Sequence, residues 1–376
     1  MGNKSDISRR NFLKAAGIAF GAATVGQSRV QGKELQAAEP PGDKGGILLK
    51  RKLGRTGLEV TTVSVGTGSG QEPNVLRYGI SKGINFIHTS STYAGGRAIR
   101  HVAEAIKGQR DKVFLGLKIT WDALDDNAMN KALETLGVDQ VDVAFFNIHS
   151  VRGMQDEKLK QGAERWKKSG KCRYIGLTTH KQIQGCVKAA LDQGFYDVIM
   201  PSYNLGMEAD MRPLLERAEK ANVGVVLMKT QHGLDADAYG NAVAKYLATP
   251  GVTTICKTLN TFAAVDGMIS DSGKRLDAKL DRTIRDAGRI GLAGRCSMCG
   301  VCDDVCPEGI DVADRVRCSD YYLAHSGYYG TAQEVFAGLK PWQGASVCTD
   351  CDLCEAACES GVPIRHHLNR VEKLLA

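Results

Sequence analysis

Residues 84–93 read INFIHTSSTY, an apolar run that ends in polar side chains. Phe86 and Ile87 are typical of a buried strand, and His88 and Tyr93 follow where such a strand would end. Short apolar runs of this kind recur along the middle of the chain. Between them lie amphipathic segments with the periodicity of a helix. The predicted strands are VTTVSVGT (60–67), INFIHT (84–89), KVFLGLKI (112–119), VDVAFFNIH (141–149), YIGLTTH (174–180), VIMPSYN (198–204), GVVLMK (224–229) and TTICKT (253–258).

This alternation of strands and helices predicts a parallel sheet, because parallel neighbours need crossover connections. Eight such units within residues 47–275 are typical of a closed (β/α)8 TIM barrel. An open doubly wound sheet is the alternative. It would usually carry a glycine-rich phosphate-binding turn after its first strand, and GTGSGQ (66–71) matches G-x-G-x-x-G poorly. The fold class expected is therefore α/β, with a (β/α)8 barrel as the main domain.

Polar or charged side chains stand at or just past the ends of at least five predicted strands. A single histidine in such a position is more often a hydrogen-bonded core residue than a functional one. Polar side chains at the ends of several strands are better explained by function, because a barrel gathers the carboxyl ends of its strands on the face that carries its active site. The sequence therefore predicts a functional pocket there, built from His88, Lys118, His149, Thr178, Thr179, Asn204, Lys229 and Lys257.

The N-terminal segment has the pattern of an export signal. SRRNFLK (8–14) pairs two arginines ahead of the weakly hydrophobic AAGIAFGAATVG (15–26), as twin-arginine signals do. The apolar part is too short to span a bilayer comfortably, and an amphipathic or disordered tail is the alternative. AEPPGDKGG (38–46) is typical of a linker. We expect residues 1–46 to be signal and linker, and the processed protein to be periplasmic or otherwise exported, without a stable membrane span.

Twelve cysteines are present, and eight of them lie in two short runs, CSMCGVCDDVCP (296–307) and CTDCDLCEAAC (348–358). Both have the spacing C-x2-C-x2-C-x3-C, which is typical of [4Fe-4S] ligation with the fourth cysteine serving the other cluster. A disulfide scaffold would be short and would spread its cysteines, and zinc usually takes two separated C-x2-C pairs. Two [4Fe-4S] clusters are predicted, one held by Cys296, Cys299, Cys302 and Cys358, the other by Cys348, Cys351, Cys354 and Cys306.

Residues 276–376 are expected to form a small, mainly α-helical ferredoxin-like domain, because the cysteine runs stand too far apart for a compact bacterial ferredoxin. Cys318 lies outside the runs and is interpreted as a packing residue. Twin-arginine export carries folded proteins, so the clusters and the signal support each other. Helices are predicted over 276–293, which would connect the domains, and over 311–326 and 329–339.

The overall composition is that of a soluble globular protein, with 43% hydrophobic and 24% charged residues. The formal net charge of +7 is mild for 376 residues, and no long Lys/Arg run occurs. A solvated basic surface is the simplest explanation, so no nucleic-acid partner is expected.

Several of these stretches together resemble the aldo-keto reductase family over residues 48–270. They are RKLGRTGLEV (51–60), GINFIHTSSTYAGG (83–96), FLGLKIT (114–120), FFNIHS (145–150), GLTTH (176–180), PSYNL (201–205) and GVVLMK (224–229). The resemblance implies a (β/α)8 barrel in which NADPH delivers a hydride to a carbonyl and a tyrosine donates the proton.

The resemblance also implies roles for four residues. Tyr93 corresponds to the proton donor, Lys118 to the ammonium that lowers the tyrosine pKa from about 10, and His149 to the group that orients the carbonyl. His88 stands where the family has an aspartate. A neutral imidazole supplies no negative charge, so we expect the pKa of Lys118 to fall and the acid–base chemistry to be altered.

The expected dinucleotide site departs from the family as well. Thr178 and Thr179 stand where the family commonly has Ser-Asn, while Lys257 and Thr258 fit the pair that meets the 2′-phosphate. The arginine usually found a few residues later is replaced by Ala263. NADP(H) is therefore a possible cofactor rather than a firm expectation.

The favoured function is an exported oxidoreductase that interconverts a small-molecule carbonyl and an alcohol, with electrons from NADPH, the clusters or both, and with a redox partner protein. An altered barrel that serves only as an electron-transfer subunit of a larger complex is one alternative. An ordinary NADPH reductase with a structural cluster domain is another.

Overall fold

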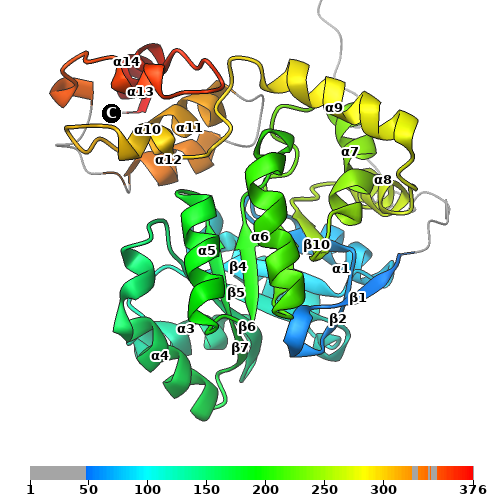
Figure 1. Ribbon diagram of the computed structural model, residues 1–376. Coiled ribbons are helices and arrows are strands. Elements are labelled where there is room, and N and C mark those ends of the chain that lie inside the picture. Colours follow the sequence, from blue (N-terminus) through cyan, green and yellow to red (C-terminus); the bar gives the residue numbers. More distant parts are fainter. Residues whose placement is uncertain (1–47, 324–328, 338, 340–344, 376) are drawn as a thin grey trace, which may run out of the picture. The chain divides into compact units, whose positions relative to one another are not determined.

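Eight parallel strands close into a barrel in the order β10-β3-β4-β5-β6-β7-β8-β9 (Figure 1). In this computed structural model the described residues are 48–323, 329–337, 339 and 345–375. Ile255 of the last strand pairs with Val63 of the first, so the predicted barrel is confirmed and the open sheet was the wrong alternative. The strands are β3 (Val63–Gly66), β4 (Phe86–Ser90), β5 (Phe114–Ile119), β6 (Val141–Asn147), β7 (Cys172–Thr179), β8 (Val198–Pro201), β9 (Gly224–Leu227) and β10 (Val252–Lys257).

The run predicted as one strand over 60–67 is divided in two. β2 (Glu59–Thr61) pairs with β1 (Lys50–Lys52) in an antiparallel hairpin, and only then does β3 enter the barrel. The hairpin turn carries Leu53, which is fully buried in the inner core. A Cβ on Gly224, the first residue of β9, would lie 2.7 Å from the Leu53 side chain. Leu53 therefore plugs the end of the barrel where the strands begin.

The barrel interior is filled by side chains and is not a pore. Phe145 of β6 is fully buried there and crosses toward both neighbouring strands. A Cβ on Gly116 of β5 would lie 2.9 Å from its ring, and one on Gly176 of β7 would lie 2.3 Å from it. These two glycines give the phenyl ring its space, so the interior volume is set by complementary large and small residues.

Eight helices surround the strands, as the amphipathic segments predict (Figure 1). Several begin at a capping side chain: Asp125, Asp235 and Thr261 each accept a hydrogen bond from an N–H three residues on. The helices are α1 (Pro73–Ser81), α2 (Arg97–Ile106), α3 (Asp126–Leu136), α4 (Glu157–Lys168), α5 (Ile183–Gln193), α6 (Glu208–Lys220), α7 (Ala236–Ala248) and α8 (Phe262–Ser272).

The C-terminal segment, called the cysteine module below, is helical. Its helices are α9 (Ala278–Leu292), α10 (Val301–Asp304), α11 (Val312–Leu323), α12 (Tyr329–Ala337), α13 (Leu353–Ala356) and α14 (Ile364–Leu375). α9, α11 and α12 occupy the three stretches predicted as helices. The module has its own small core, made by Ile310, Val316 and Leu368 with the cysteines packed against it. The barrel and the module lie within one compact unit of the chain.

Some expectations fall outside the described residues. These are the twin-arginine signal and linker at 1–46, and parts of two predicted helices at 324–326 and 338. Among the helices that are described, none has the length and apolar character that crossing a bilayer requires.

Candidate active site and cysteine centres

His88 lies in β4 and is almost completely buried. Its ring packs edge-on against Phe145, with 5.4 Å between ring centroids. Within the described part of the chain its Nε2 atom has no hydrogen-bond partner. Burial, assisted by the charge of Lys118, lowers the pKa of His88 to about 3. His88 is therefore neutral near pH 7 and neither repels nor neutralises the lysine beside it.

Tyr93 and Lys118 come together beside His88. Lys118 belongs to β5, and its Nζ atom lies 5.1 Å from the centroid of the Tyr93 ring. The His88 and Tyr93 rings are 6.2 Å apart. Tyr93 opens a short 3-10 turn, η3 (Tyr93–Gly96), in which Ala94 has a φ of 50°. A left-handed non-glycine residue costs energy and is typical of functional sites.

His149 follows β6 and meets a second histidine from the next strand. The backbone N–H of His180 donates to Nδ1 of His149 at 3.3 Å, and the two rings are 5.7 Å apart. His180 in turn has its Nδ1 2.7 Å from the hydroxyl of Ser202. Burial, the largest cause in each case, lowers the pKa of His149 to about 4 and that of His180 well below its usual value. His180 is not among the site residues predicted from the sequence, although it ends the motif GLTTH (176–180).

The two threonines predicted to bind the dinucleotide are buried at the end of β7. Thr178 donates through its hydroxyl to Asn147 at 3.0 Å, and Thr179 donates to the carbonyl of Lys181 at 2.9 Å. Both hydroxyl protons are therefore used within the protein. The oxygen lone pairs that remain can still accept a hydrogen bond from a carboxamide.

The pair predicted to meet a 2′-phosphate lies at the end of β10. Lys257 donates to the side-chain oxygen of Gln231, and its Nζ lies 4.7 Å from the ring centroid of Tyr239. Burial, and then the charge of Lys229, lowers the pKa of Lys257 to about 8. A phosphate dianion beside this cation would offset that burial, so the site fits an anion electrostatically. Thr258 donates to the carbonyl of Gly66 at 3.1 Å.

The first predicted cysteine quartet is brought together although Cys358 is far from the others in sequence. Burial, with smaller contributions from Asp320 and from the nearby thiols of Cys299 and Cys358, raises the pKa of Cys296 to about 12. Burial, and then the charge of Asp303, raises the pKa of Cys302, and the thiols of Cys296, Cys299 and Cys358 contribute to the same shift. The N–H of Met298 points to the sulfur of Cys296 at 3.3 Å. Backbone N–H groups directed at cysteine sulfurs are a recurrent feature of iron–sulfur sites.

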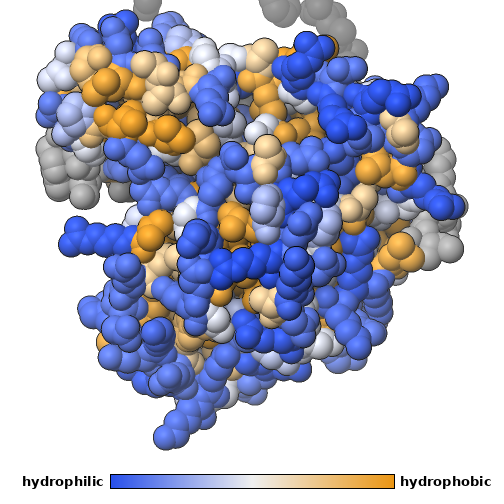
Figure 2. Space-filling view, viewed as in Figure 1, coloured by the Kyte–Doolittle hydropathy of each residue, from blue (hydrophilic) through white to orange (hydrophobic). Residues whose placement is uncertain are grey.

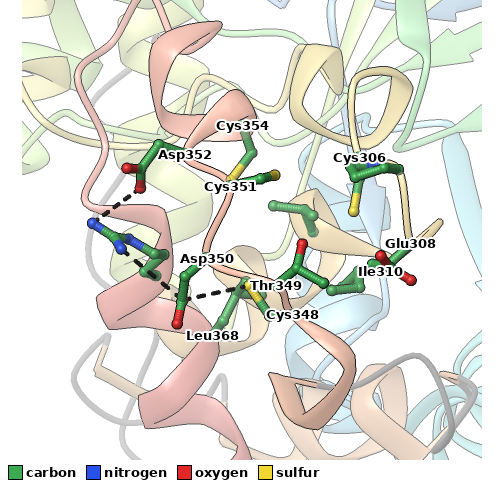
Figure 3. A pocket seen from close by; sticks show the side chains of 13 residues that line it. Cys306, Glu308, Ile310, Cys348, Thr349, Asp350, Cys351, Asp352, Cys354 and Leu368 are labelled. Atoms are coloured by element: carbon green, nitrogen blue, oxygen red, sulfur yellow. Dashed lines mark hydrogen bonds and ion pairs between the residues drawn. The ribbon is translucent and has the colours of Figure 1, made fainter.

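The second quartet lines one small, partly open cavity (Figure 3). Cys306 comes from the first run, whereas Cys348, Cys351 and Cys354 come from the second. Ile310, Val312 and Leu368 give the cavity apolar walls. The cavity is thus built from both cysteine runs, as the crossed pattern of ligands predicts.

The two runs also fold alike. In each run, the residues two and four positions after the first cysteine have a left-handed backbone conformation. They are Met298 and Gly300 after Cys296, and Asp350 and Asp352 after Cys348. Each run then enters a one-turn helix, α10 or α13. Successive backbone turns of this kind wrap cysteines around a common centre. The two runs thus share a backbone conformation as well as the cysteine spacing C-x2-C-x2-C-x3-C.

In the described ranges, no three His, Cys, Asp or Glu side chains converge closely enough to hold a single metal ion. This finding concerns sites for one ion. A [4Fe-4S] cluster takes each thiolate on a different iron, so its four ligands stand farther apart than those of a mononuclear site. The donor set, four thiols around one apolar cavity, fits such a cluster.

Comparisons with known proteins point to one family. The sequence model of the "Aldo/keto reductase family" matches residues 71–268. The uncharacterized oxidoreductase YqkF of Bacillus subtilis is 28% identical over 149 residues, covering 35% of this chain and 48% of that protein. The methylglyoxal reductase YeaE of Escherichia coli is 29% identical over 160 residues, covering 39% and 54%. The chain therefore spans about half the length of the curated relatives that it matches.

Solved structures agree on the fold. The aldo-keto reductase AKR11C1 from Bacillus halodurans, in its holo form, has a TM-score of 0.55 and 18% identity, over 65% of this chain and 97% of that one. An aldo-keto reductase from Klebsiella pneumoniae in complex with NADPH has a TM-score of 0.53 and 21% identity, over 64% and 96%. At these identities the likeness concerns the barrel architecture.

Proposed function

Because the chain belongs to the aldo/keto reductase family, and so is an oxidoreductase, we propose that it interconverts a small carbonyl compound and an alcohol. NADP(H) would supply or accept the hydride, and two [4Fe-4S] clusters in the cysteine module would carry electrons between the barrel and a redox partner protein. The observation that carries the enzymatic part is the grouping of Tyr93, Lys118 and His149 at the carboxyl ends of neighbouring strands.

In this proposal Tyr93 donates the proton to the carbonyl oxygen. The ammonium of Lys118 favours the phenolate that remains and so eases the transfer. His149 accepts at Nδ1, which leaves its Nε2–H to bond the carbonyl oxygen. His88 contributes no charge, so Lys118 acts on Tyr93 without the carboxylate that the family provides.

The dinucleotide would be held by Thr178 and Thr179 at the nicotinamide end and by Lys257 and Thr258 at the 2′-phosphate end. The buried Lys257 is the strongest support, because its depressed pKa would recover when an anion binds. The reductases from Klebsiella pneumoniae and Bacillus halodurans that share this fold were solved with NADPH or in holo form.

The clusters are supported by the shared cavity of Cys306, Cys348, Cys351 and Cys354 and by the repeated backbone turns of the two runs. Each cluster carries one electron at a time, so two together hold the pair that a carbonyl or NADP+ needs. Insertion of clusters before twin-arginine export would account for the signal pattern at residues 8–26, so we propose that the protein acts outside the cytoplasm.

An electron-transfer subunit with an inactive barrel is the second candidate. It is favoured by the loss of the family carboxylate at His88 and by the internal hydrogen bonds of Thr178 and Thr179. Such a protein would load both clusters and bind a redox partner, yet would not turn over a carbonyl.

The two candidates are separated by one set of measurements on anaerobically purified protein. Iron and sulfide content and the visible spectrum test the clusters, and mass spectrometry tests for a co-purified dinucleotide. NADPH oxidation is then followed with methylglyoxal first, because the Escherichia coli relative is named for that substrate. Loaded clusters without turnover of any carbonyl, even at high dinucleotide concentration, would favour the electron-transfer subunit.

A further inference from the structure

The barrel holds the first cysteine run through the loops that follow its strands. His232, in the loop after β9, has its Nε2 2.5 Å from the carbonyl oxygen of Cys296. Asn204, after β8, donates through its amide to the carbonyl of Ser297 at 2.9 Å. Two neighbouring barrel loops thus bond directly to the backbone of the first ligand and of the residue after it.

A third loop, after β7, makes a buried ionic contact with the cysteine module, at Asp303 of the first run and at two carboxylates that follow the run. The side chain of Lys181 is only 13% exposed. Its Nζ lies 2.5 Å from Asp311, 3.4 Å from Asp314 and 3.6 Å from Asp303, all from the cysteine module. Asp303 directly follows the ligand Cys302. One cation that serves three carboxylates is a strong tether, because its removal leaves buried charges uncompensated.

The backbones at this contact approach as closely as glycines permit. A Cβ on Gly291, at the end of α9, would lie 1.6 Å from the carbonyl oxygen of Gly233 in the loop after β9. A Cβ on Gly300 in the first run would lie 3.2 Å from the backbone nitrogen of Gln182. The first run is therefore held in a fixed position against the barrel loops.

The second quartet is held less directly, since the contact that reaches its lining is the one from Lys181 to Asp311, which stands between Ile310 and Val312. Among the described residues its cavity is lined only by the module itself. The lining residues are Cys306, Pro307, Glu308, Ile310, Val312, Cys348, Thr349, Asp350, Cys351, Asp352, Cys354, Arg365 and Leu368. Cys351 is exposed, and Leu353 beside it is 49% exposed. In Figure 2 apolar side chains gather over the module at the upper left, whereas α3 and α4 of the barrel are mostly hydrophilic. The second quartet faces outward.

The loop after β9 also joins the first quartet to the predicted dinucleotide site. Gln231 accepts a hydrogen bond from Lys257, and the next residue, His232, contacts Cys296. Gln231, at the predicted 2′-phosphate end, and His232, at the first cluster ligand, are therefore consecutive residues.

We propose that the quartet of Cys296, Cys299, Cys302 and Cys358 is the inner electron-transfer centre, which exchanges electrons with the barrel site. His232 and Lys181 are positioning residues that hold it there, and the quartet of Cys306, Cys348, Cys351 and Cys354 is the outer centre. This assignment rests on the proposed function. NADP+ takes up two electrons and one proton to give NADPH, and each reduced cluster gives one electron. A one-electron donor protein would refill the outer centre, and dithionite replaces it in the test.

The test is a redox titration of the full-length protein with loaded clusters, followed by electron paramagnetic resonance. Cys299→Ser and Cys351→Ser first assign the two signals to the two quartets. His232→Phe is expected to shift the midpoint potential of the first quartet and leave the second unchanged. Lys181→Gln is expected to shift the first signal more than the second, because its partner Asp311 also adjoins the lining of the second quartet. Arg365→Gln is the matched control, because Arg365 pairs with Asp352 at 3.0 Å beside the second quartet. It is expected to shift only the second signal.

A second readout is the rate at which NADP+ reoxidises dithionite-reduced clusters in a stopped-flow instrument. His232→Phe and Lys181→Gln should slow this rate by at least tenfold. Shifts confined to the second quartet, or no shift in either signal, would overturn the assignment, as would wild-type clusters that NADP+ cannot reoxidise. A purified protein without iron would instead overturn the proposed function, so the two failures are distinguishable.

Discussion

The backbone N–H of His180 donates a hydrogen bond to Nδ1 of His149, with 3.3 Å between the two nitrogens. A neutral imidazole that accepts at Nδ1 carries its proton on Nε2. His149 is neutral near pH 7, because burial lowers its pKa to about 4. The hydrogen bond from His180 thus fixes the tautomer of the group that would bind a carbonyl oxygen, and burial fixes its charge.

Replacing His149 with phenylalanine should lower kcat/KM for carbonyl reduction by about 10²–10³-fold, the usual loss when one donor to a developing oxyanion is removed. His149→Gln keeps an N–H donor of similar reach and should recover much of the loss. Steady-state NADPH oxidation measures both variants. Equal impairment of the two would mean that His149 does not act through its donated hydrogen bond.

His88→Asp restores the carboxylate that the family places beside the lysine. A negative charge there should keep Lys118 cationic and favour the phenolate of Tyr93. We expect carbonyl reduction near pH 7 to rise, by at most tenfold for each unit by which the pKa of the tyrosine falls. His88→Asn is the control, since it removes the imidazole without adding charge. An activity that rises equally in both variants, or in neither, argues against an electrostatic role for position 88.

Acid stability should depend on the buried histidines. His88 and His149 have folded-state pKa values of about 3 and about 4, mainly because of burial, whereas an unfolded histidine titrates near 6.5. Between those values the unfolded chain binds protons that the folded chain does not, so stability is lost as pH falls below about 6.5. Each histidine contributes up to roughly 1.4 kcal/mol per pH unit in this window. Chemical denaturation from pH 7 to pH 4.5 measures the slope, and His88→Asn should reduce it.

The barrel could be predicted from sequence because its strands are separate apolar runs and the helices between them show an amphipathic periodicity. The division of residues 60–67 could not, because β2 is set apart by its pairing with β1 and by the Leu53 plug. His180 was missed for a similar reason, since its contact with His149 needs β6 and β7 to be neighbours. The Lys181–Asp311 contact joins positions 130 residues apart, and no local pattern records such a pair.

The packing of Phe145 makes a direct test of the barrel interior. In Gly176→Ala the new methyl group would lie 2.3 Å from the phenyl ring, so the strands must shift or the ring must leave its rotamer. Overpacking of this kind costs about 1–3 kcal/mol. Gly267→Ala is the matched control, because that exposed position in α8 has no atom within 4 Å of the added Cβ. It should stabilise the protein by roughly 0.5–1 kcal/mol through helix propensity. Thermal unfolding of both variants measures the difference.

The crossed arrangement of cysteines predicts which cluster each substitution removes. Cys358 belongs to the second run in sequence, yet its thiol lies with those of Cys296 and Cys302. Cys358→Ser should therefore abolish or alter the same resonance signal as Cys299→Ser, and iron content should fall by up to one cluster per chain. Cys306→Ser should affect the other signal, because its thiol lines the cavity of Cys351. If Cys358→Ser matched Cys351→Ser instead, each run would bind its own cluster, and the crossed ligand sets would have to be given up.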